Sequence, residues 1–299
     1  MRRPTFRHRL EHLGYRLALG VLRLLPEGLA LRFGGGMGWV AGVVLGVRRK
    51  TVRAHLLQAF PEESEAWRRR VARDSFRHVG RESLATFLLG AMSREDVLDR
   101  TEVVGLEAVQ AAVDSGDGAI LVTGHFGNWE IAGASLAARG VPLDVVVQRQ
   151  RNPLFDADIN RTRERLGMTV IQRSAAPKKV LRSLRAGRAI AIVGDQNLRR
   201  GGIFVDFFGR KASTARGAAI FALRTGSPIF LAIIRRLPRY PPRYRLTLEP
   251  VAFSPSGDME EDVLRLTEAH TRHLEEEIMR APEQYFWQHR RWKTRPPGG

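Results

Sequence analysis

The stretch Ala119-Ile-Leu-Val-Thr-Gly-His-Phe-Gly-Asn-Trp-Glu130 decides the fold of this chain. Its apolar start, Ala119 to Val122, is bounded by glycines on both sides, which is typical of a short buried strand. A tight turn then carries His125 between two glycines. Asn128 is a good helix N-cap, so we expect a helix from about this residue to Gly140. The stretch therefore predicts a strand, a turn and a helix in succession.

The chemistry of this turn depends on His125 and Glu130. Residues five apart on one continuous helix point in different directions. With His125 in the turn and Glu130 in the first helical turn, however, the carboxylate can reach back to the imidazole, as in a general base with a charged orienter. A partly buried histidine capped by a glutamate is the structural alternative. His270 and Glu275 have the same spacing, but their pattern is a continuous charged helix, and we expect a solvated face there.

The segments that follow alternate between strand and helix patterns. Strands are predicted at 119–123, 143–147, 168–171, 189–194, 229–234 and 244–252, with helices at 128–138, 155–166, 177–186, 213–225 and 258–280. Such alternation predicts an α/β fold with a mixed, mostly parallel sheet flanked by helices. Sites in these sheets open at the carboxyl ends of strands. His125 lies at one such end, and Asp195 and Gln196 lie at another.

Composition limits the possible chemistry. The chain has 299 residues, 43% of them hydrophobic, which is enough for one α/β domain with terminal additions. It has no cysteine, which excludes disulfides, thiolate metal sites and a cysteine nucleophile. We find no His-Glu-x-x-His motif either, and predict neither a metal nor a cofactor. The net charge of +18 indicates a polyanionic partner or surface.

The N-terminal region, residues 1–60, is predicted to be a membrane-associating helical region that precedes an α/β domain at 61–299. It holds eleven arginines and lysines against two glutamates. Residues 6–25 have an apolar stripe and a basic face, a membrane-surface signature that a core-packing helix would share. The uncharged run 33–47 is about 22 Å long as a helix, short of the roughly 30 Å of a bilayer core. We therefore expect residues 6–47 to dip into one leaflet.

Two further features of the sequence bear on packing. Gly34, Gly38, Gly42 and Gly46 recur at every fourth residue, which predicts a smooth helix face for close packing. The tail from Pro282 to Pro296 mixes aromatic residues with cations. It is interpreted as an interfacial anchor, an anion clamp or a structural wrap around the sheet, and structure is the expected role of its aromatic residues.

Several of these segments together resemble the lipid A biosynthesis acyltransferases, the late lauroyl and myristoyl transferases. The resemblance extends from about residue 10 to 297, with His55 as a departure expected to be structural. It rests on Ala59-Phe-Pro-Glu62, Gly124-His-Phe-Gly-Asn-Trp-Glu130, Gly194-Asp-Gln196, Phe207-Phe-Gly209 with Thr214, and above all the long signature Ile278–Pro296.

The resemblance implies a glycerolipid-acyltransferase-like fold on the cytoplasmic face of the inner membrane. It also implies an acyl thioester donor, either acyl carrier protein or acyl-CoA, and a lipid A precursor as acceptor. His125 is implied as general base with Glu130 as its partner, and Arg163 and Asp195 as further functional residues. Arg161 competes with Arg163 for its role.

The physical interpretation agrees with these implications. Acyl transfer to a hydroxyl needs a base and donors for the oxyanion. Ser135 lacks the surroundings of a nucleophile elbow, so direct transfer is simpler than an acyl-enzyme. An anionic lipid acceptor suits the arginine excess, and we predict further substrate-binding residues at Asn128, Arg149, Gln196 and Arg216.

Three other functions remain as alternatives. A same-fold acyltransferase would act on a lysophospholipid or a glycosylated phospholipid. A nucleic-acid-binding protein is favoured by charge alone, and no reading module is found, so no nucleic-acid partner is expected. A non-catalytic membrane adaptor would be favoured if the His125 pocket were closed.

Overall fold

The computed structural model describes residues 3–239 and 241–296. A seven-stranded sheet runs through it in the order β1-β9-β8-β2-β5-β3-β4, and neighbouring strands are parallel except β8 and β9. The predicted mixed, mostly parallel sheet is therefore confirmed. The strands are β1 (Thr101–Val104), β2 (Ala119–Thr123), β3 (Leu143–Val147), β4 (Thr169–Gln172), β5 (Ala189–Val193), β8 (Ile229–Arg236) and β9 (Tyr244–Pro250). The predicted strand bounds are correct to within two residues.

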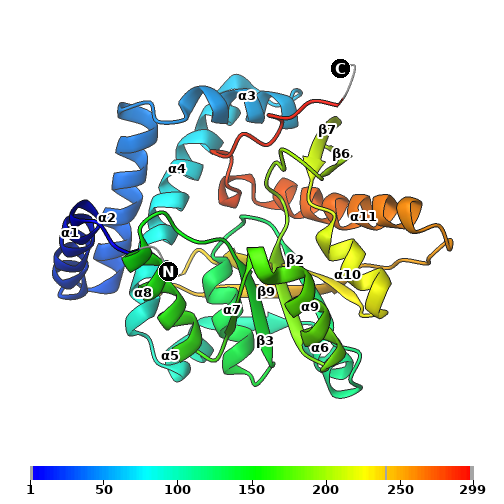
Figure 1. The fold of residues 1–299 in the computed structure, drawn as a ribbon. Helices are drawn as coiled ribbons and strands as arrows, with labels where there is room; N and C mark the ends of the chain where they lie inside the picture. The colour runs from blue at the N-terminus through cyan, green and yellow to red at the C-terminus, as the bar shows by residue number, and fades with distance from the viewer. Residues whose placement is uncertain (1–2, 240, 297–299) are drawn as a thin grey trace.

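Helices lie on both faces of this sheet (Figure 1). They are α1 (Phe6–Arg23), α2 (Glu27–Trp39), α3 (Arg49–Ala59), α4 (Glu65–Leu88), α5 (Arg94–Arg100), α6 (Leu106–Asp114), α7 (Trp129–Ala138), α8 (Pro153–Arg165), α9 (Ala176–Arg185), α10 (Gly217–Thr225) and α11 (Met259–Arg280). Successive side chains of a strand point to opposite faces. Ile120 and Val122 accordingly join one core cluster with α9, α10 and α11, while Ala119 and Leu121 join the other with α5, α6 and α7.

A small hairpin, β6 (Ile203–Phe207) and β7 (Arg210–Thr214), stands apart from the main sheet. Its two-residue turn is Phe208 and Gly209, both at positive φ, the conformation that matches the twist of paired strands. The helix predicted at 213–225 therefore begins late, at Gly217, because Ser213 and Thr214 belong to β7. The sequence prediction also missed β1 and α6.

The predicted packing face is confirmed for Gly34, Gly38 and Gly42, which follow one another along α2 and the π-helical turn after it, but not for Gly46, which lies beyond that turn at φ of 69° next to the Arg49 side chain. A side chain at Gly38 would place its Cβ 2.1 Å from the carbonyl oxygen of Phe76 on α4, and one at Gly42 would meet the Phe76 ring at the same distance. Opposite them, Gly80 of α4 meets the backbone of Gly34 and Gly38. Only glycines allow two helix backbones to approach this closely.

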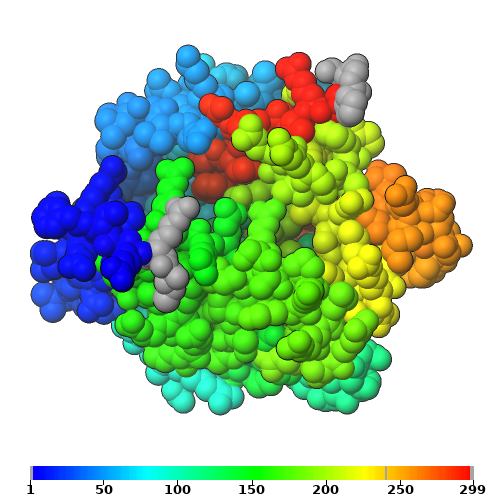
Figure 2. All heavy atoms as spheres, viewed as in Figure 1, coloured from blue at the N-terminus to red at the C-terminus, as the bar shows by residue number. Residues whose placement is uncertain are grey.

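The N-terminal helices α1 and α2 lie at one side of the molecule, next to α4 and α8 (Figures 1 and 2). The apolar run that follows Trp39 winds into a π-helical turn, Val40–Val44. Within the described residues, no single helix is both long and apolar enough to cross a bilayer. One pair, Glu27–Val44 with Arg49–Ala59, has the required length and composition but is bent by 89°.

The expectation of a solvated face at His270 is wrong. Its side chain is buried, with 4% of the residue exposed. The charged pattern of α11 concealed a second, apolar stripe, and this stripe faces the core: Val263, Leu266, Leu274 and Ile278. Burial lowers the pKa of His270 to about 4, so this histidine is neutral in the folded protein.

Candidate active site

His125 and Asp195 come together because β2 and β5 are parallel neighbours. Thr123 pairs with Val193 at the carboxyl ends of these strands. His125 lies two positions after Thr123, and Asp195 lies two positions after Val193. The imidazole Nδ1 of His125 lies 2.6 Å from one carboxylate oxygen of Asp195, and the backbone N–H of His125 donates to the other at 2.9 Å. One carboxylate thus fixes both the ring and the main chain of the histidine.

The electrostatics of this pair define the tautomer of His125. Burial of Asp195 opposes its charge, but the neighbouring His125, which also donates two hydrogen bonds, and the cation of Arg291 outweigh it. They lower the pKa of Asp195 to about 2. An ionised carboxylate can only accept, so Nδ1 carries a proton and Nε2 of neutral His125 is left as the acceptor. Nε2 lies 3.0 Å from the side-chain nitrogen of Gln196, which is solvent-exposed.

Glu130 has a different partner from the one predicted. Arg163 of α8 holds its carboxylate with two hydrogen bonds, Nε to Oε2 at 2.9 Å and a terminal nitrogen to Oε1 at 2.5 Å. The carboxylate that orients His125 belongs to Asp195, since Glu130 projects from the first turn of α7 toward α8. The prediction of a His125–Glu130 contact is therefore corrected to two pairs, His125 with Asp195 and Glu130 with Arg163.

Arg163 and its competitor Arg161 occupy different environments. Arg163 is largely buried between Glu130 and Asn160, and its side chain is 13% exposed. Arg161 is 75% exposed and reaches only Asp158, at 3.7 Å. The geometry therefore favours Arg163 as the structurally fixed cation near the turn.

The other predicted substrate-binding residues divide between buried and exposed positions. Asn128 is 2% exposed, its oxygen caps α7 at the N–H of Ile131, and its nitrogen donates to Glu82. Its polar atoms are occupied by protein, so the predicted contact of Asn128 with substrate is corrected to a structural cap. Arg149 and Arg216 are exposed, the first just beyond the carboxyl end of β3 and the second at the start of α10. Among the described residues neither contacts the His125 group.

The turn itself requires glycine at position 127. This residue has φ of 56°, and a Cβ on it would lie 1.8 Å from the carbonyl oxygen of Ile234. Any larger residue would push the turn off β8 and displace His125 from Asp195.

The C-terminal tail packs against the turn that carries His125. The N–H of Phe286 donates to the carbonyl of His125 at 2.9 Å, Phe126 and Tyr285 form an isolated bridge, and Gly127 donates to Gln284. Trp287 and Trp292 are buried in the core. Arg291, also buried, donates to Ser213 and lies over the Phe207 ring. Of the three interpretations of the tail, a structural wrap is confirmed for these residues.

The sequence did not predict that tail residues contact the site. His289, for example, accepts a hydrogen bond from the backbone N–H of Asn197 at 3.0 Å, near the carboxyl end of β5. The dense aromatic pattern signalled a buried segment, but no spacing in the sequence connects residues 284–289 with residues 125–127. His55 binds the carbonyl of Trp287 at 3.0 Å and stacks edge-on against Trp292, in keeping with its expected structural role.

The arrangement around His125 suits proton transfer without a protein nucleophile. Ser135 is fully buried in α7 and donates to Thr101, so its hydroxyl is not available to a substrate. Over residues 3–239 and 241–296, no cluster of three or more histidine and carboxylate side chains could hold a metal ion. The site therefore consists of a polarised imidazole, its buried carboxylate and the adjacent arginine–glutamate pair.

Comparisons with known proteins agree with this architecture. The lipid A lauroyltransferase of Escherichia coli (strain K12) is 30% identical, with 99% of this chain and 97% of the relative covered. The palmitoleoyltransferase of the same organism is 28% identical over 94% and 91%. The phosphatidylinositol mannoside acyltransferase of Mycolicibacterium smegmatis is 29% identical over 73% and 72%. The family model described as bacterial lipid A biosynthesis acyltransferase matches residues 3–294. The chain thus belongs to the bacterial lipid A biosynthesis acyltransferase family and is an acyltransferase.

Proposed function

We propose that this acyltransferase moves a fatty acyl chain from a thioester donor directly to a hydroxyl of a lipid A precursor, with His125 as general base and Asp195 as its orienter. Membership of the family accounts for the coarser part of this activity, acyl transfer to lipid A or a related lipid acceptor. The observation that carries the finer part is the His125–Asp195 pair at the carboxyl edge of the sheet.

The reaction follows from the tautomer of His125. Nε2 accepts the proton of the acceptor hydroxyl as its oxygen attacks the thioester carbonyl carbon. The tetrahedral intermediate then collapses, the carbon–sulfur bond breaks, and the thiolate takes the proton back from Nε2. The imidazolium that forms in between is stabilised by the ionised Asp195, whose pKa of about 2 keeps it charged throughout.

Gln196 occupies the place that an acceptor hydroxyl needs. Its amide nitrogen lies 3.0 Å from Nε2 of His125 and, as a donor, holds that atom as an acceptor. We assign Gln196 as a side chain that gives way to the hydroxyl, which its exposure permits.

Glu130 and Arg163 act together in this proposal. The two-bond clamp of Glu130 fixes the Arg163 guanidinium beside α7. Three of its five N–H groups are used by Glu130 and Asn160, and the remaining ones are available to an acceptor phosphate or to the thioester oxyanion. Arg149 and Arg216, exposed as they are, remain candidate contacts for the anionic parts of either substrate.

The N-terminal helices support a position on the inner membrane, at its cytoplasmic face. Among residues 3–239 and 241–296, nineteen large apolar side chains are exposed, and fourteen of them lie in residues 6–47. On α1 the apolar stripe Phe6, Leu10, Leu13, Leu17, Val21 and Leu24 faces outward, while His12 and Tyr15 pack toward α8. An apolar patch of this extent on a protein surface marks an interaction site. We infer that this surface lies in the outer part of one leaflet and gives the enzyme access to lipid substrates.

The acceptor has one specific alternative. The similarity to a phosphatidylinositol mannoside acyltransferase over 73% of the chain favours a glycosylated phospholipid as second candidate. Mass spectrometry of lipids from cells with and without the protein distinguishes the two, because the acylated headgroup differs in mass.

The base is tested with His125→Ala in the purified enzyme, assayed with acyl carrier protein or CoA thioesters and lipid A precursor in detergent micelles. We expect a loss of roughly a hundredfold or more in kcat with an unchanged fold. Glu275→Ala serves as control and should retain activity, because Glu275 follows His270 in α11 at the same spacing as Glu130 follows His125 but lies outside the proposed site. Near-normal turnover by His125→Ala would overturn the mechanism.

A further inference from the structure

We propose that the cavity beneath α1 binds a phosphate group of the lipid acceptor, with Arg23 and Arg161 as its principal ligands. The inference builds on the proposed function, since it names where the acceptor headgroup sits.

The cavity has a volume of about 280 Å³ and lies where α1 meets α4 and α8. Arg16 and Arg23 of α1 form one wall, and Arg161 and Arg165 of α8 form the opposite one. Glu130 lines it as well, so the cavity reaches the first turn of α7, five residues beyond His125. Ligand pockets range over roughly 300–1,000 Å³, so this space suits a headgroup fragment rather than a whole lipid.

The charge around the cavity is positive, because its guanidinium groups outnumber its carboxylates. Four arginines line it against Glu130 and Asp158. Glu130 is neutralised by Arg163, which lies outside the cavity lining. Asp158 accepts from His12 at 2.7 Å and lies 3.8 Å from Arg16 and 3.7 Å from Arg161, so one carboxylate faces four guanidinium groups. The guanidinium groups are thus left with an uncompensated charge that an anion would balance.

Arg23 is the least satisfied of these cations. Within the described residues it forms no ion pair or side-chain hydrogen bond. Its terminal nitrogen extends over Gly90, where a Cβ would lie 3.5 Å from it. Arg161 makes only the long contact to Asp158 and is mostly exposed. Two guanidinium groups from opposite walls of a cavity match the several acceptor oxygens of one phosphate.

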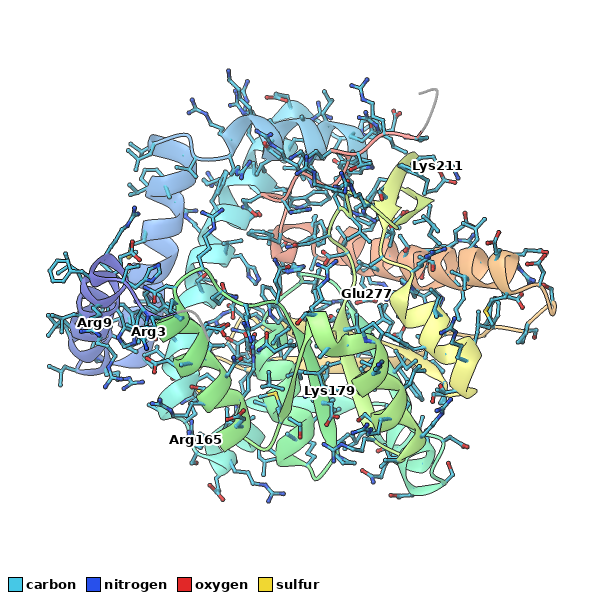
Figure 3. All side chains as sticks on the ribbon, viewed as in Figure 1. Arg3, Arg9, Arg165, Lys179, Lys211 and Glu277 are labelled. Atoms are coloured by element: carbon cyan, nitrogen blue, oxygen red, sulfur yellow. The ribbon has the colours of Figure 1, made fainter. Side chains whose placement is uncertain are left out.

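Arg165 is less suited to act as a ligand. Its two terminal nitrogens donate to the carbonyls of Met92 and Leu89 at 2.8 and 3.2 Å, so it contributes charge but few free N–H groups. Arg165 is labelled in Figure 3 at the end of α8, and Arg9, which lies outside the cavity, is labelled on α1.

The remaining lining favours a headgroup over an acyl chain. Tyr15, Leu19 and Phe87 give the cavity an apolar side suited to the C–H face of a sugar ring. An acyl chain would instead remove water from six charged side chains without replacing their hydrogen bonds, at a large cost in free energy. The apolar outer stripe of the same helix α1 would hold the cavity at the depth where lipid phosphates lie.

The test measures binding without a donor, so that it is independent of catalysis. The probe is phosphatidic acid in neutral detergent micelles, compared with diacylglycerol, and affinity is followed by equilibrium partition into the protein-bound fraction. The variant is Arg23→Gln combined with Arg161→Gln. Its matched control is Arg9→Gln with Arg185→Gln, which removes the same charge from exposed positions on α1 and α9.

We expect the cavity variant to bind phosphatidic acid at least tenfold more weakly, with diacylglycerol unaffected and the control within twofold of the unmodified protein. Equal losses in both double variants would overturn the proposal, because net charge alone would then explain binding. No loss in the cavity variant would also overturn it. Displacement of the lipid by an equal concentration of inorganic phosphate would assign the site to a free anion and refute the lipid source. Binding retained in His125→Ala separates this result from the fate of the proposed mechanism.

Discussion

Asp195→Asn tests the proposed role of Asp195 as the residue that orients His125, because the substitution changes the chemistry of one side chain while keeping its shape. In the native protein one carboxylate oxygen accepts from Nδ1 of His125 and the other from the backbone N–H of the same residue. The amide oxygen of an asparagine must keep the backbone N–H, because an NH₂ group cannot accept it. The NH₂ group then faces Nδ1 and donates to it.

This reversal moves the imidazole proton to Nε2, the atom that accepts the proton of the acceptor hydroxyl in the proposed mechanism. The equivalent exchange in a Ser-His-Asp triad lowers kcat by about 10⁴. We expect a loss of about 10³–10⁴ here, or roughly 4–5 kcal/mol of transition-state stabilisation.

The assay is initial-rate acyl transfer by the purified protein in detergent micelles, with thermal unfolding measured in parallel. Asp144→Asn is the control, since Asp144 is buried like Asp195 but pairs with Arg188 near the start of β3, far along the strand from the catalytic edge. A folded Asp195→Asn protein with a rate within tenfold of the native one would refute the assigned tautomer.

Further expectations concern the Glu130–Arg163 pair, the packing of α2 against α4, the dependence of stability on pH, and membrane binding. Arg163→Lys keeps the charge but loses the two-bond geometry with Glu130, so kcat/KM should fall by at least tenfold, whereas Arg188→Lys, at a comparable pair outside the site, should leave it unchanged. Gly38→Ala places a methyl group 2.1 Å from the Phe76 carbonyl oxygen and should lower the free energy of unfolding by about 1–3 kcal/mol in denaturant titrations. Gly14→Ala, on the open surface of α1, should leave it unchanged. Equal unfolding midpoints for the two variants would contradict the close packing of α2 against α4. Burial lowers the pKa of His78 and of His270 to about 4, so the unfolded chain binds more protons between pH 6.5 and 4. The free energy of unfolding should therefore be highest above pH 6.5 and decrease as the pH is lowered from 6.5 to 4, by on the order of 1.4 kcal/mol per pH unit for each histidine. A free energy of unfolding that does not change over this range would contradict the buried neutral state. Finally, the double variant Leu10→Ser, Leu17→Ser should reduce flotation with phospholipid vesicles by severalfold, while Leu264→Ser on α11 should leave it unchanged. Equal flotation of the two variants would contradict membrane binding through the apolar stripe of α1.

The predictable part of this molecule is the part that local sequence determines. The strand, turn and helix around His125 follow from an apolar run, two glycines and an N-cap within twelve residues, and the structure has them at those positions. The packing of Gly34, Gly38 and Gly42 against α4 was equally readable, because their spacing of four residues follows the helical period.

The partners of the site residues could not be predicted, because they depend on the order of strands. β2 and β5 are neighbours although β3 and β4 lie between them in the sequence, and this adjacency is what brings Asp195 to His125. Glu130 was predicted to reach back within its own turn, but the fold offered it a guanidinium from α8. Phe208 illustrates a different limit, since a hairpin turn with a phenylalanine at positive φ gives no turn signal in the sequence.

The contact between the tail and the catalytic turn has a consequence for how the enzyme is made. Every strand of the main sheet is complete by residue 250, yet the turn at residues 125–127 is secured by main-chain hydrogen bonds from residues 284–286. A chain still emerging from the ribosome therefore holds every residue of its main sheet before it holds the residues that fix this turn. The same segment is part of the core, since Tyr285, Trp287 and Trp292 are buried. A protein truncated after α11 would therefore lose both the hydrogen bonds that hold the turn and a share of the apolar contacts that stabilise the fold.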